Sequence, residues 1–253
     1  MHLIWNILNP KRQSDKLISK LLAYHQLGSG SYIGLNRISS EKFETHLKIL
    51  NEMGFSSDLD FKIIFDDGYE SVYKIAFPLM QKYGFTGLVF PVVSYIGKMN
   101  YWDVTFGSIN KAMHLNSSEI KSLVNEGWEI GSHGLTHTAF TALSNKELKI
   151  ELHESKQILE DIIQQEAVSI APPFSRWAEK IKDLILECGY KKIYYQPTIT
   201  NIPYPETIPR YSVYVIDGER ALTRKINNSK FELIKELIIH KCSTLTVAVK
   251  EIL

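Results

Sequence analysis

Short hydrophobic runs alternate with amphipathic stretches along most of the chain. Each run predicts a buried β-strand, and the runs cover residues 21–25, 61–65, 87–93, 128–131, 167–171, 191–195 and 211–215. The stretches between them place apolar residues at helical spacing, as Phe43, Leu47 and Leu50 do ahead of Gly54. Further helices are predicted over residues 72–83, 116–127, 144–163, 180–188 and 231–242.

A strand–helix alternation of about seven units is typical of an α/β protein with a parallel sheet. Two architectures fit this order of elements, an open doubly wound sheet and a closed (β/α) barrel. In both of them ligands bind at the carboxyl ends of the strands, so the residues just after each apolar run are the candidates for function. No low-complexity linker interrupts the chain, and we predict a single domain over residues 1–253.

Composition narrows the class of protein without assigning an activity. The 253 residues include 29 Lys plus Arg and 28 Asp plus Glu, a formal net charge of +1, which argues against a broad nucleic-acid surface. Two cysteines, Cys188 and Cys242, are too few for a disulfide framework or a cysteine-rich zinc site. Without a secretory signal pattern or a membrane-spanning run, we expect a cytoplasmic protein with no nucleic-acid partner and no transmembrane segment.

Polar and titratable residues recur at the ends of the predicted strands. They are His25, the Asp66-Asp67-Gly68 corner, His133 with His137, and the Pro172-Pro173-Phe174 segment. Because the carboxyl ends of parallel strands gather at one edge of the sheet, we expect these residues to lie near one another.

The adjacent carboxylates Asp66 and Asp67 would repel each other if both faced one pocket. A nearby cation relieves that repulsion, so that one carboxylate can bind a metal while the other acts as a base. Gly68 permits a sharp turn that frees the two side chains from strand alternation. The alternative interpretation is a simple turn that caps the following helix, since Asp and Gly favour turns.

His133 and His137 are spaced so that both imidazoles can lie on one face of a helical turn or of a loop of similar shape. Two histidines and one carboxylate form a metal site that leaves positions open for water and substrate. Taken alone, the pair could equally be two surface histidines in a polar loop. The combination with the carboxylate corner is far more specific than either part.

In this combination the chain resembles a polysaccharide deacetylase of the carbohydrate esterase family four (NodB-homology) type. The specific matches are Ile64-Phe-Asp-Asp-Gly68 and Glu129-Ile-Gly-Ser-His133-Gly-Leu-Thr-His137. Looser matches are Tyr24-His25, Tyr101-Trp102-Asp103, Ala171-Pro-Pro-Phe174 and Ile208-Pro-Arg210. The resemblance implies a distorted (β/α)7 barrel and a metal-dependent hydrolase that removes acetyl groups from N-acetylated sugars of a polysaccharide or glycan precursor.

The resemblance also implies roles for individual residues. Asp66 matches the catalytic base, and Asp67, His133 and His137 match the metal-binding triad. The substrate would contact Pro172, Phe174, Trp102 and Arg210, with Trp102 stacking on a sugar ring unless it belongs to the core. Zinc is the expected divalent ion, although cobalt, nickel or iron would suit the same ligands.

Two departures from the family pattern leave alternatives open. Ala171 stands where the family often has an arginine that orients the catalytic carboxylate, and Arg176 or Arg210 could replace it. The late segment that supplies an acid has only a superficial counterpart ending at His240, so His25 is the preferred candidate for the acid. A glycan-binding relative without turnover is therefore kept as a rival function. An amide hydrolase for a small non-sugar substrate on the same barrel is a second rival.

Overall fold

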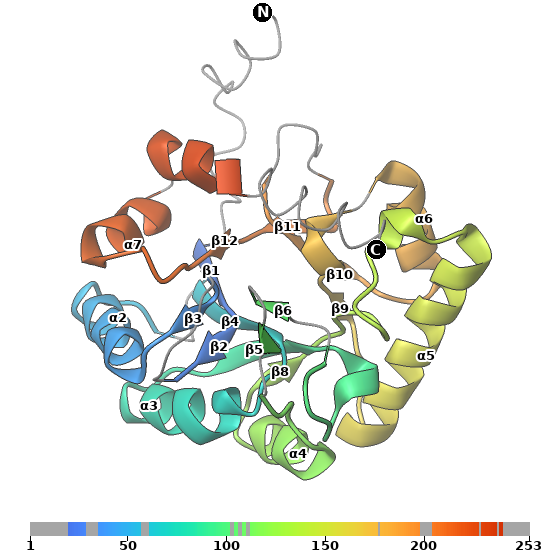
Figure 1. Ribbon diagram of the computed structural model, residues 1–253, viewed down its shortest axis with the longest axis horizontal. Coiled ribbons are helices and arrows are strands. Elements are labelled where there is room, and N and C mark those ends of the chain that lie inside the picture. The colour runs from blue at the N-terminus through green and yellow to red at the C-terminus, as the bar shows by residue number, and fades with distance from the viewer. Residues whose placement is uncertain are drawn as a thin grey trace, which may run out of the picture.

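Parallel strands form the centre of the molecule and helices surround them (Figure 1). The structure, a computed structural model, describes residues 20–28, 35–56, 61–101, 104–105, 108–109, 112–176, 178–197, 204–227, 229–236 and 238–239. The domain boundaries at residues 1 and 253 stay a prediction.

The strands form a five-stranded sheet of order β12-β1-β4-β5-β8 and a three-stranded sheet of order β11-β10-β9. Their neighbours pair in parallel throughout these two sheets. The bounds are β1 (Lys20–Tyr24), β4 (Phe61–Asp67), β5 (Gly87–Pro91), β8 (Glu129–Ile130), β9 (Ser169–Ile170), β10 (Lys192–Tyr195), β11 (Thr207–Pro209) and β12 (Tyr211–Ser212).

Two short connections join the sheets into a ring. On one side, a parallel bridge links Ser132, just after β8, to Ile170 of β9. On the other side, β11 and β12 are consecutive pieces of one strand that is broken at Arg210, so the chain passes directly from one sheet to the other. The predicted distorted (β/α)7 barrel is thereby confirmed, and the doubly wound alternative is wrong.

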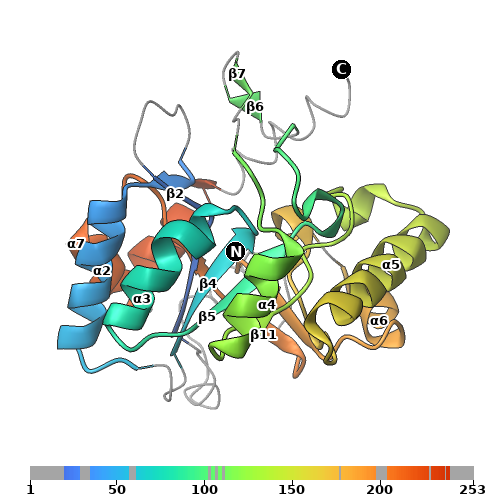
Figure 2. The ribbon, with the colours of Figure 1, turned by 90° about the horizontal axis from the view of Figure 1, so that it is seen from below.

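The helices cover the outside of this barrel, as the side view in Figure 2 also shows. Their bounds are α2 (Ser40–Glu52), α3 (Phe77–Lys82), α4 (Ser117–Asn125), α5 (Asn145–Ile163), α6 (Glu179–Glu187) and α7 (Glu219–Ile226). Smaller elements are β2 (Gln26–Leu27), β3 (Arg37–Ile38), β6 (Val104–Thr105) and β7 (Ser108–Ile109). No helix in the described part of the chain combines the length and apolarity needed to cross a bilayer.

The helix starts follow their capping residues, whereas several other boundaries differ from the predictions. Capping boxes form at Asn116 with Glu119 and at Ser144 with Glu147, as the sequence predicts. The helix predicted over 72–83 is a π-helical turn (Val72–Ala76) followed by α3, which begins next to Pro78. The strand predicted over 211–215 ends at Ser212, and α7 was not predicted.

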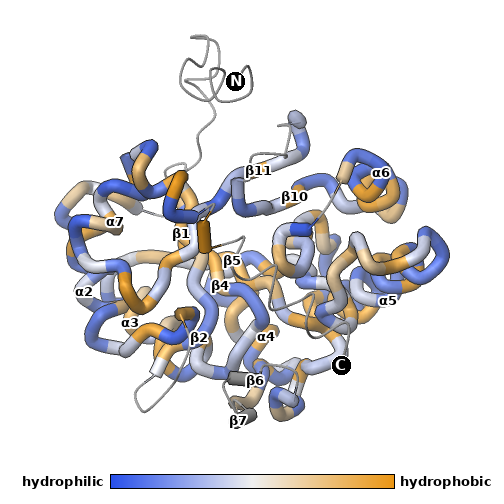
Figure 3. The backbone as a smooth tube through the Cα atoms, turned by 45° about the horizontal axis from the view of Figure 1, so that its top comes forward, coloured by the Kyte–Doolittle hydropathy of each residue, from blue (hydrophilic) through white to orange (hydrophobic). Residues whose placement is uncertain are grey.

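Side chains of the strands alternate between the barrel interior and the layer outside it, where two hydrophobic cores pack beneath the helices. Figure 3 shows hydrophobic colour on the central strands and alternating colour along the helices. The larger outer core includes Leu22, Tyr24, Ile63, Phe65 and Val89, and the smaller one includes Ile170, Ile193 and Tyr195. The barrel interior holds the intervening positions Leu21, Ala23, Ile64, Leu88, Phe90, Ala171 and Tyr194.

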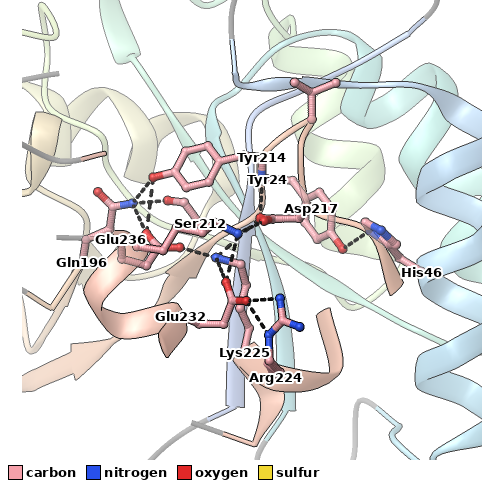
Figure 4. A network of polar contacts seen from close by, with 12 residues as sticks. Tyr24, His46, Gln196, Ser212, Tyr214, Asp217, Arg224, Lys225, Glu232 and Glu236 are labelled. Atoms are coloured by element: carbon pink, nitrogen blue, oxygen red, sulfur yellow. Dashed lines mark hydrogen bonds and ion pairs between the residues drawn. The ribbon is translucent and has the colours of Figure 1, made fainter. Parts of the chain in front are cut away.

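A buried charge network holds the C-terminal helical residues 230–236 against the barrel (Figure 4). The side chain of Lys225 is fully buried, and its Nζ lies 3.4 Å from Asp217 Oδ2 and 3.7 Å from Glu232 Oε2. The same ammonium donates to Glu236, and Lys235 contacts both Asp217 and Glu232. Opposite charges therefore compensate one another where water is excluded.

The network also reaches the ends of the strands. Gln196, directly after β10, donates through its side-chain amide to Ser212 of β12, to Tyr214 and to Glu236. This side chain therefore bridges the broken strand and the C-terminal helical residues. Because Gln196 follows a strand of the three-stranded sheet while Ser212 belongs to the five-stranded sheet, the contacts favour barrel closure.

Replacing Lys225 with Met should lower the free energy of unfolding by about 3–5 kcal/mol, because it leaves buried carboxylates without their shared cation. The matched control is Lys191→Met, which removes an exposed pair with Glu166 and should change stability by at most about 1 kcal/mol. Urea unfolding of the native protein and both variants measures the difference. Equal stabilities of the two variants would contradict the compensating role of Lys225.

The deficit of Lys225→Met should shrink as the pH is lowered below neutrality. Burial raises the pKa of the Glu236 carboxyl in the native fold, and removing the adjacent cation raises it further. A carboxyl whose pKa is higher in the folded than in the unfolded state stabilises the fold at low pH, and this contribution is lost as the pH rises through the folded-state value. Unfolding curves at several pH values test the sign.

Candidate metal centre

Strand alternation points several titratable side chains into the same end of the barrel. Each lies two positions beyond a residue on the interior side: His25 after Ala23, Asp66 after Ile64, His133 after Gly131, and Arg210 after Ile208. A Cβ built on Gly131 would lie 2.4 Å from Phe90 Cε1, which places that position against the interior core. The carboxyl ends of the strands thus gather these groups, as expected for a parallel barrel.

Asp66 is held by a buried ion pair with Arg210. The two residues are only 3% and 2% exposed, and Arg210 Nη1 donates to Asp66 Oδ1. The guanidinium lies over the ring of Phe90, 5.6 Å from its centroid. The other carboxylate oxygen, Oδ2, lies 3.8 Å from His25 Nε2. The sequence predicts Arg210 as a substrate contact and leaves open whether Arg176 or Arg210 orients the catalytic carboxylate. In the structure, Arg210 is the arginine that contacts Asp66.

Burial alone would raise the pKa of Asp66, but the charge of Arg210 outweighs it with help from nearby imidazoles, and the net shift is downward. The carboxylate is therefore ionised at neutral pH. One oxygen is engaged by the guanidinium and the other faces His25.

Asp67 departs from the strand geometry that Asp66 follows. Its φ is +65° and that of Gly68 is +68°, so the backbone turns through two consecutive left-handed residues. A Cβ on Gly68 would lie 2.7 Å from the Cα of Pro91, so the neighbouring strand leaves no room for a side chain there. His114 Nδ1 lies 2.9 Å from the Asp67 carbonyl oxygen, a contact that no sequence motif indicates.

Asp67, His133 and His137 converge on one point. Asp67 Oδ1 lies 3.5 Å from His133 Nε2 and 3.4 Å from His137 Nε2, and one ligand atom from each residue falls within 4.8 Å of the others. His133 Nδ1 donates to the Ala171 carbonyl at 2.6 Å, which leaves Nε2 to face the carboxylate. Burial lowers the pKa of His133 to about 4, so its imidazole is neutral near pH 7.

This donor set fits a divalent metal ion. Burial works to raise the pKa of Asp67, yet the hydrogen bond from His137 and the surrounding imidazoles lower it overall. The site therefore offers one carboxylate oxygen and a neutral imidazole nitrogen fixed by a backbone carbonyl, with His137 beside them. A hydrogen bond from the second ring nitrogen, like that of His133 to the Ala171 carbonyl, orients histidine ligands in metal sites generally. Two nitrogens with one carboxylate oxygen suit zinc and neighbouring metals.

The predicted substrate contacts lie beside this cluster only in part. The ring of Phe174 packs edge-on against His137 with centroids 4.7 Å apart, and Pro172 is buried just before it. Phe174 has a φ of +56° and Ser175 one of +50°, so this short segment is itself strained. Trp102 lies outside the described residues, as does His240. The substrate roles of Pro172, Phe174 and Trp102 stay predictions.

Three comparisons relate the chain to known proteins. The sequence profile of the polysaccharide deacetylase family matches residues 60–193, more than half of the chain. YxkH of Bacillus subtilis, whose name places it among the polysaccharide deacetylases, is 27% identical over 188 residues, 68% of this chain and 62% of that protein. The chain thus spans less than two thirds of that relative.

Solved structures share the fold at low sequence identity. A polysaccharide deacetylase from Bacillus cereus superposes with a TM-score of 0.67 at 22% identity, over 81% of this chain and 68% of that one. The Streptococcus pyogenes deacetylase PplD, solved in complex with acetate, gives 0.67 at 17% identity over 81% and 96% of the two chains. An α/β barrel with a carboxylate and two histidines at its strand ends thus defines the class, and the chain belongs to the polysaccharide deacetylase family.

Replacing Gly68 with Ala should lower the free energy of unfolding by about 2–4 kcal/mol, through left-handed strain and a clash with the Pro91 backbone. Gly84→Ala is the matched control, because Gly84 has a similar φ of +73° but nothing within 4 Å of an added Cβ. The control should lose only about 1–2 kcal/mol. Urea unfolding compares the two, and equal losses would show that the approach of β5 does not constrain the Asp67 turn.

Proposed function

We propose that this protein is a metal-dependent hydrolase that removes acetyl groups from N-acetylated sugars of a polysaccharide or glycan precursor. The observation that carries the proposal is the convergence of Asp67, His133 and His137 within 4.8 Å, next to a second carboxylate, Asp66, that is held by Arg210. Family membership supports the acetyl group as the group removed. So does the acetate recorded with the Streptococcus pyogenes relative.

The three converging residues would hold the divalent ion, with zinc as the expected metal. The chemistry that such an ion supplies when bound is the acidification of a water molecule and the polarisation of an acetyl carbonyl. Asp66 does not belong to this ligand set, and its Oδ1 is occupied by Arg210. Its Oδ2 is therefore the atom that accepts the proton of the attacking water as general base.

His25 completes the proton path. The bond between the acyl carbon and the sugar nitrogen breaks, and the departing amine needs a proton. His25 Nε2 lies 3.8 Å from Asp66 Oδ2, so the proton taken from water is near the imidazole that delivers it. Arg210 acts as a positioning residue, since it fixes the orientation of Asp66 through an ion pair and touches no reacting atom.

The rival function, a glycan-binding protein without turnover, rests on the missing motif arginine and the unassigned acid. Arg210 lies on Asp66 and His25 lies beside it, so both positions have an occupant that supports turnover. A sugar deacetylase and a small-amide hydrolase differ in the substrate that they cleave faster. The acetate-release experiment below therefore uses both kinds of substrate.

Acetate release from N-acetylglucosamine oligomers is expected from the zinc-loaded protein, with less from a simple acetamide. Asp67→Ala should abolish release because it removes the charged metal ligand. Asp66→Asn should lower kcat by about 10²- to 10⁴-fold while zinc stays bound, because only the base is lost. Acetate quantification and metal analysis on the same samples separate these two effects.

Asp183→Asn serves as the matched control, because Asp183 is an exposed carboxylate of α6 that pairs only with Lys182 among the described residues. It should release acetate at the native rate. An active Asp67→Ala variant, or native activity that survives complete removal of metal, would overturn the mechanism. Faster turnover of the acetamide than of the oligomers would favour the non-sugar amide hydrolase.

His25→Asn should reveal its role through the leaving group. We expect kcat for an N-acetylated sugar to fall by about 10²- to 10⁴-fold, whereas an aryl acetate, whose phenolate departs without a proton, should still be cleaved at close to the native rate. Asp66→Asn should be slow on both substrates, since both need an activated water. Equal losses of His25→Asn on the two substrates would argue against an acid role.

A further inference from the structure

Glu151 of α5 is a buried carboxylate that accepts hydrogen bonds from the loop between the two candidate histidine ligands. It is 5% exposed. Its Oε1 accepts from the backbone nitrogens of Leu135 at 2.8 Å and Thr136 at 2.7 Å. Its Oε2 accepts from the Thr136 hydroxyl at 3.1 Å. The residues that donate therefore lie between His133 and His137 in the sequence.

The opposite side of the same loop accepts backbone hydrogen bonds. Val93 N donates to the Gly134 carbonyl at 3.1 Å, and Ser94 N donates to the Leu135 carbonyl at 2.9 Å. The loop is thus fixed between the segment after β5 and the side chain of one residue on α5. Glu151 is the side-chain half of that support, because its carboxylate binds the peptide groups at Leu135 and Thr136.

The loop packs closely against the carboxylate of Glu151. Gly134 has a φ of +82°, and a Cβ there would lie 2.9 Å from Glu151 Oε1. His137 also takes a left-handed φ, of +63°, which is strained for a residue with a side chain. A strained backbone conformation persists only when surrounding contacts hold it in place. Glu151 accepts three of the hydrogen bonds that hold this loop.

Burying a carboxylate without a cation is unfavourable unless hydrogen bonds compensate it. Within the described residues, Glu151 forms no ion pair with a lysine or arginine, so the donors of this loop are its main compensation. We propose that Glu151 is a positioning residue that holds the His133–His137 loop in its metal-binding conformation. This inference rests on the proposed function, because it assigns a metal to the two histidines.

The test is zinc affinity, measured by calorimetry on metal-free protein, together with the visible spectrum of the cobalt-loaded form. Glu151→Ala should weaken zinc binding by about 10- to 100-fold, the range typical of lost second contacts to metal ligands. Glu151→Gln keeps an acceptor oxygen for Leu135 and Thr136, so it should recover part of the affinity and the native cobalt spectrum. Glu154→Ala, an exposed carboxylate on the same helix, should match the native protein.

Thermal unfolding of the metal-free variants tells a local effect on the loop from a global loss of structure. If Glu151→Ala does not fold, the partial weakening of Glu151→Gln carries the test. Native zinc affinity and an unchanged cobalt spectrum in every folded variant would overturn the role of Glu151 and leave the proposed function intact. Failure of the native protein to bind zinc would instead overturn the proposed function, and the role of Glu151 with it.

Discussion

Two adjacent carboxylates buried at the end of one strand are the constraint around which this site is arranged. Asp66 and Asp67 are 3% and 6% exposed, and their charges need separate partners because burial and mutual repulsion both disfavour ionisation. Arg210 compensates Asp66 from the broken strand. Two imidazoles face Asp67, and the left-handed turn separates the two side chains. The proposed division of labour between a base and a metal ligand rests on this separation.

Much of this arrangement can be predicted from the sequence, because strand alternation and strand ends are local properties. His25, Asp66 and His133 each follow an apolar run, and a parallel barrel brings such positions together. The sequence does not decide whether Arg176 or Arg210 is the partner of Asp66. The apolar run predicts a strand that begins at Tyr211, whereas Arg210 lies in a break between two pieces of one strand. Glu151 looked like an ordinary helix residue, because spacing does not tell a solvated carboxylate from one bound to loop amides.

The parts of the chain outside the family match also contribute residues to the same site. The profile covers residues 60–193, yet His25 precedes this range and Arg210 follows it. The closing strand pieces β11 and β12 also follow it, and β12 pairs with β1 to complete the ring. The buried network of Lys225 and its carboxylates lies beside that closure. The broken strand therefore carries both Arg210, the partner of Asp66, and Ser212, a partner of Gln196 in the buried network.

The proposed mechanism requires that Asp67, His133 and His137 bind one metal ion together. X-ray absorption at the zinc edge of the purified, zinc-loaded protein tests it most directly. We expect a first shell of nitrogen and oxygen at about 2.0–2.2 Å, with the outer-shell scattering of two imidazoles and no sulfur. Loss of one imidazole contribution in His137→Ala would agree with it. A shell without imidazole scattering, or one that contains sulfur at about 2.3 Å, would contradict it.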